Sequence, residues 1–344
     1  MTGRAFIIGG AGQIGLAVAD RLLSGGWEVT VARRGTRAPD AGLTARGMMT
    51  VVFDRDDAEA FRRALADGAD AVVDVIAHDA GHADQLLSLG TNIGALVAVS
   101  SAAVYRDAAG RALDGAGAGG FPDFPVPIPE TQRTVEPGSS AYSAKKAAME
   151  RRLLDQARTP VTIIRPGAVY GAPSSHPREW WFVKRMLDRR PFIPLAYKGE
   201  SRFHPAAAEN VAAVVAAALE NPGIRVLNAA DPVVPTVREI GGIIASALGY
   251  AGRFALVDSE GFPPGVGATP WSIPKPMVLD LRGIELLGVK LPVGYEDRAE
   301  AICRWLAETA SAGDWRERFP VLAAYPHDLF DYAAEDDFGK TKNN

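Results

Sequence analysis

The sequence has few of the residues on which several classes of protein depend. It has one cysteine among 344 residues, Cys303, so neither an internal disulfide nor a cysteine metal cluster can form. Cys303 lies in an apolar-periodic segment and is expected to pack in the core. The five histidines show no spaced cluster, which leaves metal catalysis unsupported.

Long apolar runs and a strong net charge are missing as well. No stretch approaches the roughly 20 apolar residues that a membrane span needs, and no charged leader with a cleavage site precedes the first apolar segment. We therefore expect a cytoplasmic protein with no membrane partner. The net charge of −4 and the isoelectric point near 5.8 give no overall attraction to nucleic acid, so any phosphate site must be local.

The sequence does contain a regular alternation of short apolar runs and amphipathic stretches, which predicts a parallel sheet covered by helices. The expected strands are 4–8, 28–32, 48–53, 71–76, 95–100, 161–165 and 226–228, and the expected helices are 13–24, 56–66, 140–157, 178–190 and 207–219. The fold class is α/β, a Rossmann-type doubly wound parallel sheet with a smaller C-terminal substrate lobe.

A glycine-rich turn stands between the first strand and the first helix. Gly9, Gly12 and Gly15 keep the spacing G-x-x-G-x-x-G. A tight turn needs the torsional freedom of glycine, and a missing side chain lets the backbone approach a pyrophosphate at the helix N-terminus. We expect dinucleotide binding here, with Gln13 and Ile14 of the first helical turn also in contact with the cofactor.

The residues after the second and third strands bear on which dinucleotide binds. The second strand is followed by Arg33 and Arg34, with Arg37 close by and no acidic residue. Guanidinium groups suit the 2′-phosphate of NADP, so NADP is expected and NAD is the alternative. An exposed basic loop without a ligand is the other interpretation. Asp54, with Arg55 beside it, is placed to meet the adenine ring, unless Asp54 caps the next helix instead.

Tyr142 and Lys146 are the candidates for chemistry. Their spacing of four places both side chains on one face of a helix. A phenol with an ordinary pKa near 10 is a poor proton donor or acceptor at neutral pH, and a neighbouring ammonium group stabilises its ionised form. Ser101 follows the fifth strand, at the sheet edge where α/β proteins bind ligands, and a hydroxyl there can orient a substrate oxygen.

Together these segments resemble extended short-chain dehydrogenases/reductases over most of residues 4–230. The segments that carry the resemblance are the glycine turn, Ser-Ser-Ala-Ala-Val-Tyr at 100–105, Tyr-Ser-Ala-Lys-Lys at 142–146 and Arg-Pro-Gly-Ala-Val-Tyr-Gly at 165–171. The segments at 29–35, 53–57 and 71–74 are similar to the epimerase-like branch that includes chloroplast stem-loop RNA-binding proteins. The resemblance implies Ser101, Tyr142 and Lys146 as the catalytic residues and places Pro166 and its neighbours, with Ala77, at the nicotinamide.

The chain departs from the family pattern at several positions. Ile8 replaces the usual threonine before the first glycine, and Arg106 replaces the usual glycine after Val-Tyr. Dehydratases of the family carry acidic residues directly after the catalytic hydroxyl, where this chain has Ala102 and Ala103, so dehydration is disfavoured. No asparagine is placed with certainty at the family's fourth catalytic position.

The expected division of the chain follows from these sites. Residues 1–171 form the dinucleotide-binding domain, to which 207–230 return; 172–206 and 231–330 form the substrate-binding lobe; and 331–344 form a solvated acidic tail. The Gly- and Pro-rich loop 106–138 is too long for a passive connector and is expected to border a site.

Residues of the lobe are expected to hold the substrate. His176, Trp180, Trp181 and Arg202 can stack on a ring or bind phosphates, and His78 can face the cofactor. The alternatives are that the tryptophans pack the lobe, that the cations are solvated, and that His78 is incidental.

The leading hypothesis is an NADPH-preferring oxidoreductase acting on a small carbonyl or alcohol. The first alternative is a nucleotide-sugar epimerase that keeps its NAD(P) bound and uses the same three residues. An alternative of another class is a cofactor-sensing or RNA-binding protein with a relic active site, against which the acidic isoelectric point and the intact Ser-Tyr-Lys set both weigh. The partners expected are a small-molecule substrate, no nucleic acid, and, by family analogy, a second copy in a homodimer.

Overall fold

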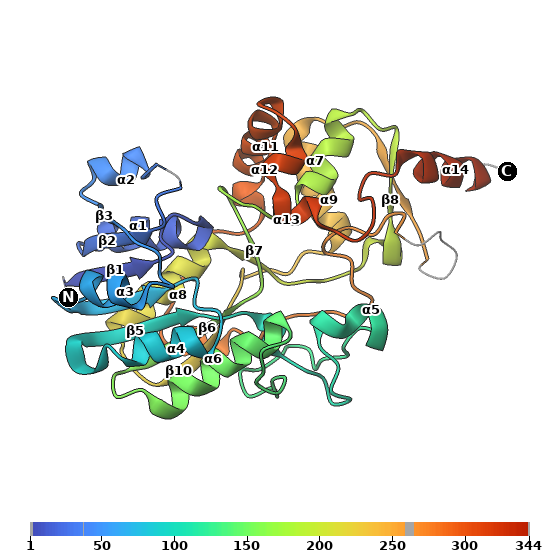
Figure 1. The fold of residues 1–344 in the computed structure, drawn as a ribbon. Helices are drawn as coiled ribbons and strands as arrows, with labels where there is room; N and C mark the ends of the chain where they lie inside the picture. Colours follow the sequence, from blue (N-terminus) through green and yellow to red (C-terminus); the bar gives the residue numbers. More distant parts are fainter. Residues whose placement is uncertain (1–2, 37, 259–264, 343–344) are drawn as a thin grey trace. The chain divides into compact units, whose positions relative to one another are not determined.

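Seven parallel strands form the central sheet of the computed structural model, which describes residues 3–36, 38–258 and 265–342 (Figure 1). The strands are β1 (Arg4–Ile8), β2 (Glu28–Arg33), β3 (Met49–Val52), β4 (Ala69–Asp74), β5 (Ile93–Val99), β6 (Val161–Pro166) and β10 (Arg225–Ala229). Their order is β10-β6-β5-β4-β1-β2-β3, and every neighbouring pair is parallel. The predicted fold class, a doubly wound α/β sheet, is confirmed.

Helices cover both faces of this sheet, which is why β1 and β5 are nearly continuous apolar runs rather than alternating ones. On one face, α1 (Gln13–Ser24) packs against α8 (Ala208–Glu220). On the other lie α3 (Ala58–Ala64), α4 (Ala80–Leu87) and α6 (Tyr142–Gln156). The core under this second face includes Phe61 of α3, Leu86 of α4 and Leu153 of α6, each at most 1% exposed.

The predicted boundaries of α1 match the structure, and those of α6 differ by two residues at the start and one at the end. Three further helices between α1 and α6 were not predicted, namely α2 (Ala41–Ala45), α4 and α5 (Ala116–Gly119). The start of α4 carries a recognisable signal, because Asp79 is its N-cap and accepts a hydrogen bond from the backbone N–H of His82.

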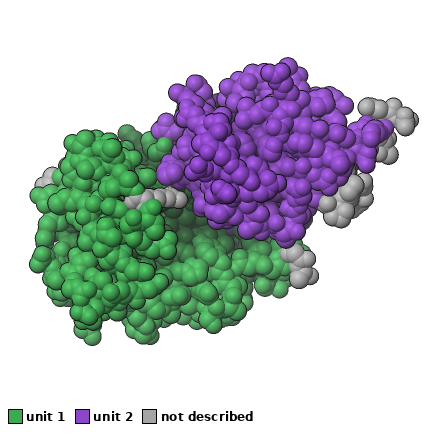
Figure 2. Space-filling model, turned by 45° about the horizontal axis from the view of Figure 1, so that its top comes forward, with its two compact units in different colours: residues 1–169, 206–230, 279–292 green, residues 170–205, 231–278, 293–344 purple. Residues whose placement is uncertain are grey.

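The chain divides into two compact units, coloured separately in Figure 2. Unit 1 contains residues 1–169, 206–230 and 279–292, and unit 2 contains 170–205, 231–278 and 293–344. Residues 279–292, with α10 (Arg282–Leu286), were assigned to the lobe from the sequence but lie in unit 1. The Asp280 backbone N–H donates to Ile128 O at 2.9 Å, and Asn228 Nδ2 donates to Asp280 O at 3.1 Å.

Unit 2 is mainly helical. Its helices are α7 (Trp180–Leu187), α9 (Val237–Leu248), α11 (Glu296–Ser311), α12 (Trp315–Arg318), α13 (Pro320–Ala323) and α14 (Tyr332–Lys342), and its strands β8 (Phe192–Leu195) and β11 (Arg253–Leu256) pair with each other. The chain passes between the units at β7 (Ala168–Tyr170) and β9 (Pro205–Ala207), and α5 (Ala116–Gly119) lies in the loop after β5.

The C-terminal residues differ from the solvated tail expected from their acidic composition. They form α14, whose Glu335 is 2% exposed and paired with Arg185 of α7, with Arg185 Nη2 2.6 Å from Glu335 Oε1. The sequence could not show this pair, because its two members lie 150 residues apart.

Across the described residues, none of the helices has the length and apolar character required to cross a bilayer. Over the same residues, no group of three or more His, Cys, Asp and Glu side chains is placed to hold a metal ion. Cys303 is 2% exposed and packs inside unit 2.

Candidate active site

The site of unit 1 begins where the order of the sheet strands reverses. β1 lies between β2 and β4, so the chain leaves β1 and β4 in opposite directions along the sheet, and the carboxyl ends of these two strands border a crevice typical of ligand binding. Ile8 is paired with Asp74 in this register, which places Gly9 beside Val75. The glycine turn and the loop after β4 therefore meet at this edge.

The glycine turn is formed for close approach of the backbone. Gly9 has φ +83°, and a Cβ there would lie 2.5 Å from Ile76 Cγ2. A Cβ at Gly15 would lie 2.4 Å from the Cα of Gly10, so only glycine lets α1 pack this closely against the turn. Both positions are explained by packing within the protein.

Gly12 differs, and this difference tests whether the turn fits a dinucleotide. A Cβ at Gly12 would have no neighbour nearer than 3.5 Å, so protein packing does not require glycine there. Gly12 is the N-cap residue of α1, which has no side-chain cap and no acidic residue in its first turn. A helix N-terminus with no acidic residue in its own first turn, preceded by a glycine that packing does not require, fits a pyrophosphate. Gln13 and Ile14 begin this helix.

The basic residues follow β2 at the same edge. Arg33 is the last residue of β2 and is half-buried, whereas Arg34 is exposed. Arg37 lies outside the described residues. The structure thus places two arginines where the ribose end of a dinucleotide would lie in this fold.

Asp54 and Arg55, which were predicted to meet the adenine, have different surroundings from each other. Asp54 is exposed, and its carboxylate accepts from the backbone N–H of Asp56 at 3.1 Å. The cap of α3 is Asp57, so the alternative role of Asp54 as that cap is wrong.

Arg55 is 6% exposed and is used inside the protein. Its Nη1 donates to Asp74 Oδ2 at 2.7 Å, and its Nη2 donates to Gln85 Oε1 at 3.1 Å. The guanidinium therefore joins the loop after β3 to the end of β4 and to α4. These contacts give Arg55 a structural role, and its contact with adenine stays a prediction.

Lys146 is held at the ends of two sheet strands. Its Nζ donates to Ala77 O at 2.6 Å and to Val99 O at 2.9 Å, so one ammonium group joins the loop after β4 to the end of β5. Burial lowers the pKa of Lys146 to about 8, against the opposing charges of Asp74 and Glu150. Ala77, predicted as a cofactor contact, is fully buried, and the contact seen in the structure is between its carbonyl and this lysine.

Tyr142 lies one turn before Lys146 on α6, and Lys146 Nζ is 5.9 Å from the centroid of its ring. Tyr142 is 45% exposed, and partial burial raises the pKa of its hydroxyl. The nearby Ser101 side chain opposes the rise. Ser101 Oγ also accepts from the backbone N–H of Ala103 at 3.1 Å. The structure thus brings together the three residues predicted to carry chemistry.

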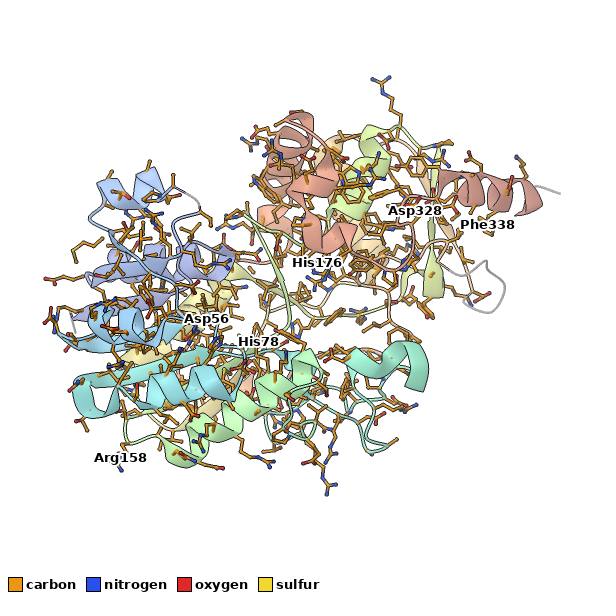
Figure 3. The ribbon with its side chains drawn as sticks, in the orientation of Figure 1. Asp56, His78, Arg158, His176, Asp328 and Phe338 are labelled. Atoms are coloured by element: carbon orange, nitrogen blue, oxygen red, sulfur yellow. The ribbon has the colours of Figure 1, made fainter. Side chains whose placement is uncertain are left out.

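His78 lies beside them. Its ring centroid is 5.6 Å from that of Tyr142, and burial, followed by the charges of Lys146 and Lys145, lowers its pKa. Figure 3 shows His78 and Asp56 on neighbouring loops at this edge of the sheet. Pro166, expected near the nicotinamide, is the buried last residue of β6.

Two residues near the site were missed in the sequence. Asp114, in the loop after β5, accepts from the Ser143 backbone N–H at 2.7 Å and so caps α6, whose own N-cap residue Ala141 has no side-chain acceptor. This contact places the part of loop 106–138 around Asp114 next to the start of α6. His82 of α4 accepts from the His78 backbone N–H at 3.0 Å. An acidic residue inside a long loop and a histidine one turn into a helix are too common in sequences to be singled out.

A buried polar network fixes α6 against the sheet. Glu150, one turn after Lys146, accepts from Arg165 Nη2 of β6 at 2.5 Å. The Arg165 guanidinium lies over the ring of Tyr105 at 4.8 Å, and the Tyr105 hydroxyl donates to Asn228 Oδ1 at 2.6 Å. The network ties together α6, the segment after Ser101 and β10.

The predicted substrate residues of unit 2 fall into two groups. Trp180 and Trp181 are 4% and 1% exposed; Trp180 packs on Phe319, and Trp181 packs under the guanidinium of Arg185 at 3.6 Å. The packing alternative accounts for both tryptophans.

His176 and Arg202 are half-buried. His176 Nε2 is 3.0 Å from the Tyr325 hydroxyl, and burial lowers the pKa of His176 to about 3, so the ring is neutral at physiological pH. Arg202 donates to the Val234 carbonyl. Figure 3 labels His176 among the side chains of unit 2.

Comparison with known proteins gives a family and a fold. The model of the NAD dependent epimerase/dehydratase family matches residues 5–230. A 2′-dehydrokanamycin reductase of Streptomyces kanamyceticus is 30% identical over 171 residues, which are 48% of this chain and 43% of the reductase, so the match spans less than half of that relative.

Solved structures with the same fold include a UDP-glucose 4-epimerase of Thermotoga maritima with UDP-glucose, with a TM-score of 0.66 and 18% identity over 89% of this chain and 99% of that one. A UDP-glucose 4-epimerase of Thermus thermophilus in complex with NAD has a TM-score of 0.64 and 21% identity over 88% and 98% of the two chains. At these identities the likeness extends to the fold.

Proposed function

Because the chain belongs to the NAD-dependent epimerase/dehydratase family, we propose that it is an oxidoreductase of the extended short-chain type that interconverts a small carbonyl compound and its alcohol. The observation that carries this proposal is the double anchoring of Lys146, whose ammonium group is bound to Ala77 O and Val99 O beneath the Tyr142 ring. A buried cation held at the ligand-binding edge of the sheet, beside a phenol, is suited to proton transfer.

The dinucleotide would be held by the N-terminus of α1 at Gly12, Gln13 and Ile14 and by the loops after β2 and β3. When bound, it supplies or accepts the hydride. Arg33 and Arg34 favour NADP over NAD, because a guanidinium group binds a 2′-phosphate with two hydrogen bonds and no acidic residue follows β2 to accept from a 2′-hydroxyl.

The protein's own residues handle the proton. The Tyr142 hydroxyl gives its proton to the substrate oxygen during reduction and takes it back during oxidation. The Lys146 ammonium group stabilises the tyrosinate that reduction leaves. Burial raises the pKa of Tyr142, and the Ser101 side chain opposes that rise. The Ser101 hydroxyl donates a hydrogen bond to the same substrate oxygen and orients it. Since Ala102 and Ala103 follow Ser101, no acidic side chain is available there to eliminate water.

The test is a panel of small aldehydes and ketones assayed by consumption of NADPH and, separately, NADH. We expect net oxidation of NADPH by the wild-type protein and a loss of about 100-fold to 10,000-fold in kcat for Tyr142→Phe, with dinucleotide affinity unchanged. Tyr250→Phe is a matched control, because it removes a hydroxyl that donates only to the Arg190 carbonyl in unit 2. Full turnover by Tyr142→Phe would exclude the phenol as the proton donor.

The same assay separates a reductase from a nucleotide-sugar epimerase. An epimerase returns the hydride to its substrate, so it consumes no cofactor and retains its dinucleotide through purification. Cofactor that copurifies with the protein, together with interconversion of UDP-sugars and no net oxidation of NADPH, would favour the epimerase.

A further inference from the structure

His82 contacts the backbone of the loop that holds Lys146. It lies in the first turn of α4, and its backbone N–H donates to the N-cap Asp79 at 3.1 Å. Its side chain is 19% exposed and turns back over the loop after β4. There its Nδ1 accepts from the His78 backbone N–H at 3.0 Å.

The second ring nitrogen has a different partner. Because Nδ1 accepts a hydrogen bond, the proton of the neutral ring is on Nε2, which lies 3.2 Å from Asp56 Oδ1 and donates to it. Asp56 is in the loop after β3. One imidazole therefore joins the loop after β3 to the loop after β4, with each nitrogen in a defined role.

The position of this bond matters for the site. The His78 N–H and the Ala77 carbonyl belong to the same planar peptide unit. His82 accepts from its N–H, and Lys146 Nζ donates to its carbonyl oxygen at 2.6 Å. A hydrogen bond on one side of a planar peptide sets the direction of the carbonyl on its other side. At the start of the loop, Asp74 Oδ1 accepts from the Ile76 N–H at 2.9 Å.

We propose that His82 is a positioning residue that, by accepting from the His78 N–H, holds the Ala77 carbonyl in the direction required to bind the Lys146 ammonium group. The inference rests on the proposed function for its catalytic consequence, but the placement of Lys146 can be measured without turnover. The same imidazole also contacts Asp56 in the loop after β3, at the adenine end of the proposed cofactor site. It therefore connects that loop to Lys146 at the other end of the site.

Two substitutions separate the two roles of the ring. In His82→Asn the amide oxygen reaches the position of Nδ1 and still accepts from the His78 N–H, but the contact with Asp56 is lost. In His82→Gln the amide extends toward Asp56 and leaves the position of Nδ1 without an acceptor. His82→Leu removes both contacts. Asp84→Asn is the matched control on α4, because Asp84 is exposed and pairs only with Arg152 at the surface.

The first measurement is the titration of Lys146 Nζ by 15N NMR in the protein without added cofactor. The wild-type pKa of this group is lowered by burial to about 8. Loss of a carbonyl acceptor disfavours the charged form, so His82→Gln and His82→Leu should lower the pKa of Lys146 further, and His82→Asn and Asp84→Asn should leave it at the wild-type value. Thermal unfolding of each variant identifies any variant that fails to fold. If His82→Leu fails to fold, the comparison of His82→Asn with His82→Gln still tests the proposal.

The second measurement is turnover of the reactant found in the carbonyl panel. We expect kcat to fall by about 10-fold to 100-fold in His82→Gln, with the KM for NADPH nearly unchanged, and to stay within about twofold of wild type in His82→Asn. A Lys146 titration in His82→Gln identical to wild type would overturn the proposal, whatever reaction the protein catalyses. Equal losses in the Asn and Gln variants, tracking their unfolding temperatures, would also overturn it and make His82 a residue of stability alone.

Discussion

At the scale of single residues, the glycine turn shows that residues of one type in one motif are required for different reasons. Gly9 and Gly15 are fixed by the protein itself, since a side chain at either position would meet neighbouring atoms at 2.6 Å or less. Gly12 has room for a methyl group. Packing within the protein therefore does not require glycine at this position, and the proposed approach of a dinucleotide there leads to a prediction.

We expect Gly12→Ala to fold with the stability of the wild type and to bind NADPH at least tenfold more weakly, because the new methyl group occupies the approach to the N-terminus of α1. Gly15→Ala should lower the thermal unfolding temperature by several degrees, because its Cβ would lie 2.4 Å from Gly10. Fluorescence titration and thermal unfolding measure the two effects.

The control for this pair is Gly242→Ala in α9, where a Cβ would meet no atom within 4 Å. Alanine in a helix interior is favoured by about 1 kcal/mol over glycine, so this variant should be slightly more stable and bind NADPH as the wild type does. NADPH affinity in Gly12→Ala equal to that of the control would show that no phosphate approaches Gly12.

At the scale of elements, the contact between α14 and α7 makes the C-terminal residues part of the core of unit 2. Arg185 Nε and Nη2 both donate to Glu335 Oε1, at 2.9 and 2.6 Å, and Arg185 Nη2 also donates to Leu329 O at 2.6 Å. Both side chains are 2% exposed. A buried pair contributes little net stability, but removal of one partner leaves the other charge buried and uncompensated.

Glu335→Gln should therefore lower the free energy of unfolding by about 3 kcal/mol, as measured in urea. Asp337→Asn is the comparison, because its pair with Lys340 is exposed on the surface of α14, and the expected change there is within about 0.5 kcal/mol. A loss in Glu335→Gln no larger than in Asp337→Asn would mean that α14 does not contribute to the core of unit 2 in solution.

At the scale of the whole molecule, the response to acid depends on buried neutral histidines in unit 2. His204 is 2% exposed, its Nε2 donates to the Asp231 carbonyl at 2.8 Å, and burial lowers its pKa to about 4. His176 behaves in the same way, with its pKa lowered to about 3. Below pH 6.5 the unfolded chain binds protons at these two histidines and the folded chain does not. The free energy of unfolding therefore decreases as the pH decreases.

We expect the free energy of unfolding to decline between pH 6.5 and pH 4, with His204 accounting for roughly 3 kcal/mol at about 1.4 kcal/mol for each pH unit, and no further loss from His204 below pH 4. His204→Gln, whose amide can still donate to the Asp231 carbonyl, should remove that part of the decline. Urea unfolding at pH 7, 5.5 and 4 measures it. Parallel curves for the variant and the wild type would show that the pKa of His204 is not lowered in the folded protein.

Short-range backbone preference and burial periodicity were enough to predict part of this structure. The bounds of β1 and α1, the turn at Gly9–Gly15 and the placement of Tyr142 and Lys146 on one helix all follow from residues within about a dozen positions of one another. The strand-helix alternation also sufficed for the fold class, because a parallel sheet needs a crossover between successive strands.

The partners of the buried polar side chains could be identified in the folded chain but not in the sequence. Arg55 has its partner Asp74 19 residues away, Lys146 has Ala77 69 residues away, and Arg185 has Glu335 150 residues away. Trp180 and Trp181 are core residues because Phe319 and Arg185 pack against them, and Phe319 is far from Trp180 in the sequence. A buried polar group must find a partner wherever the fold provides one, and hydrogen-bond geometry leaves no periodic trace in the sequence.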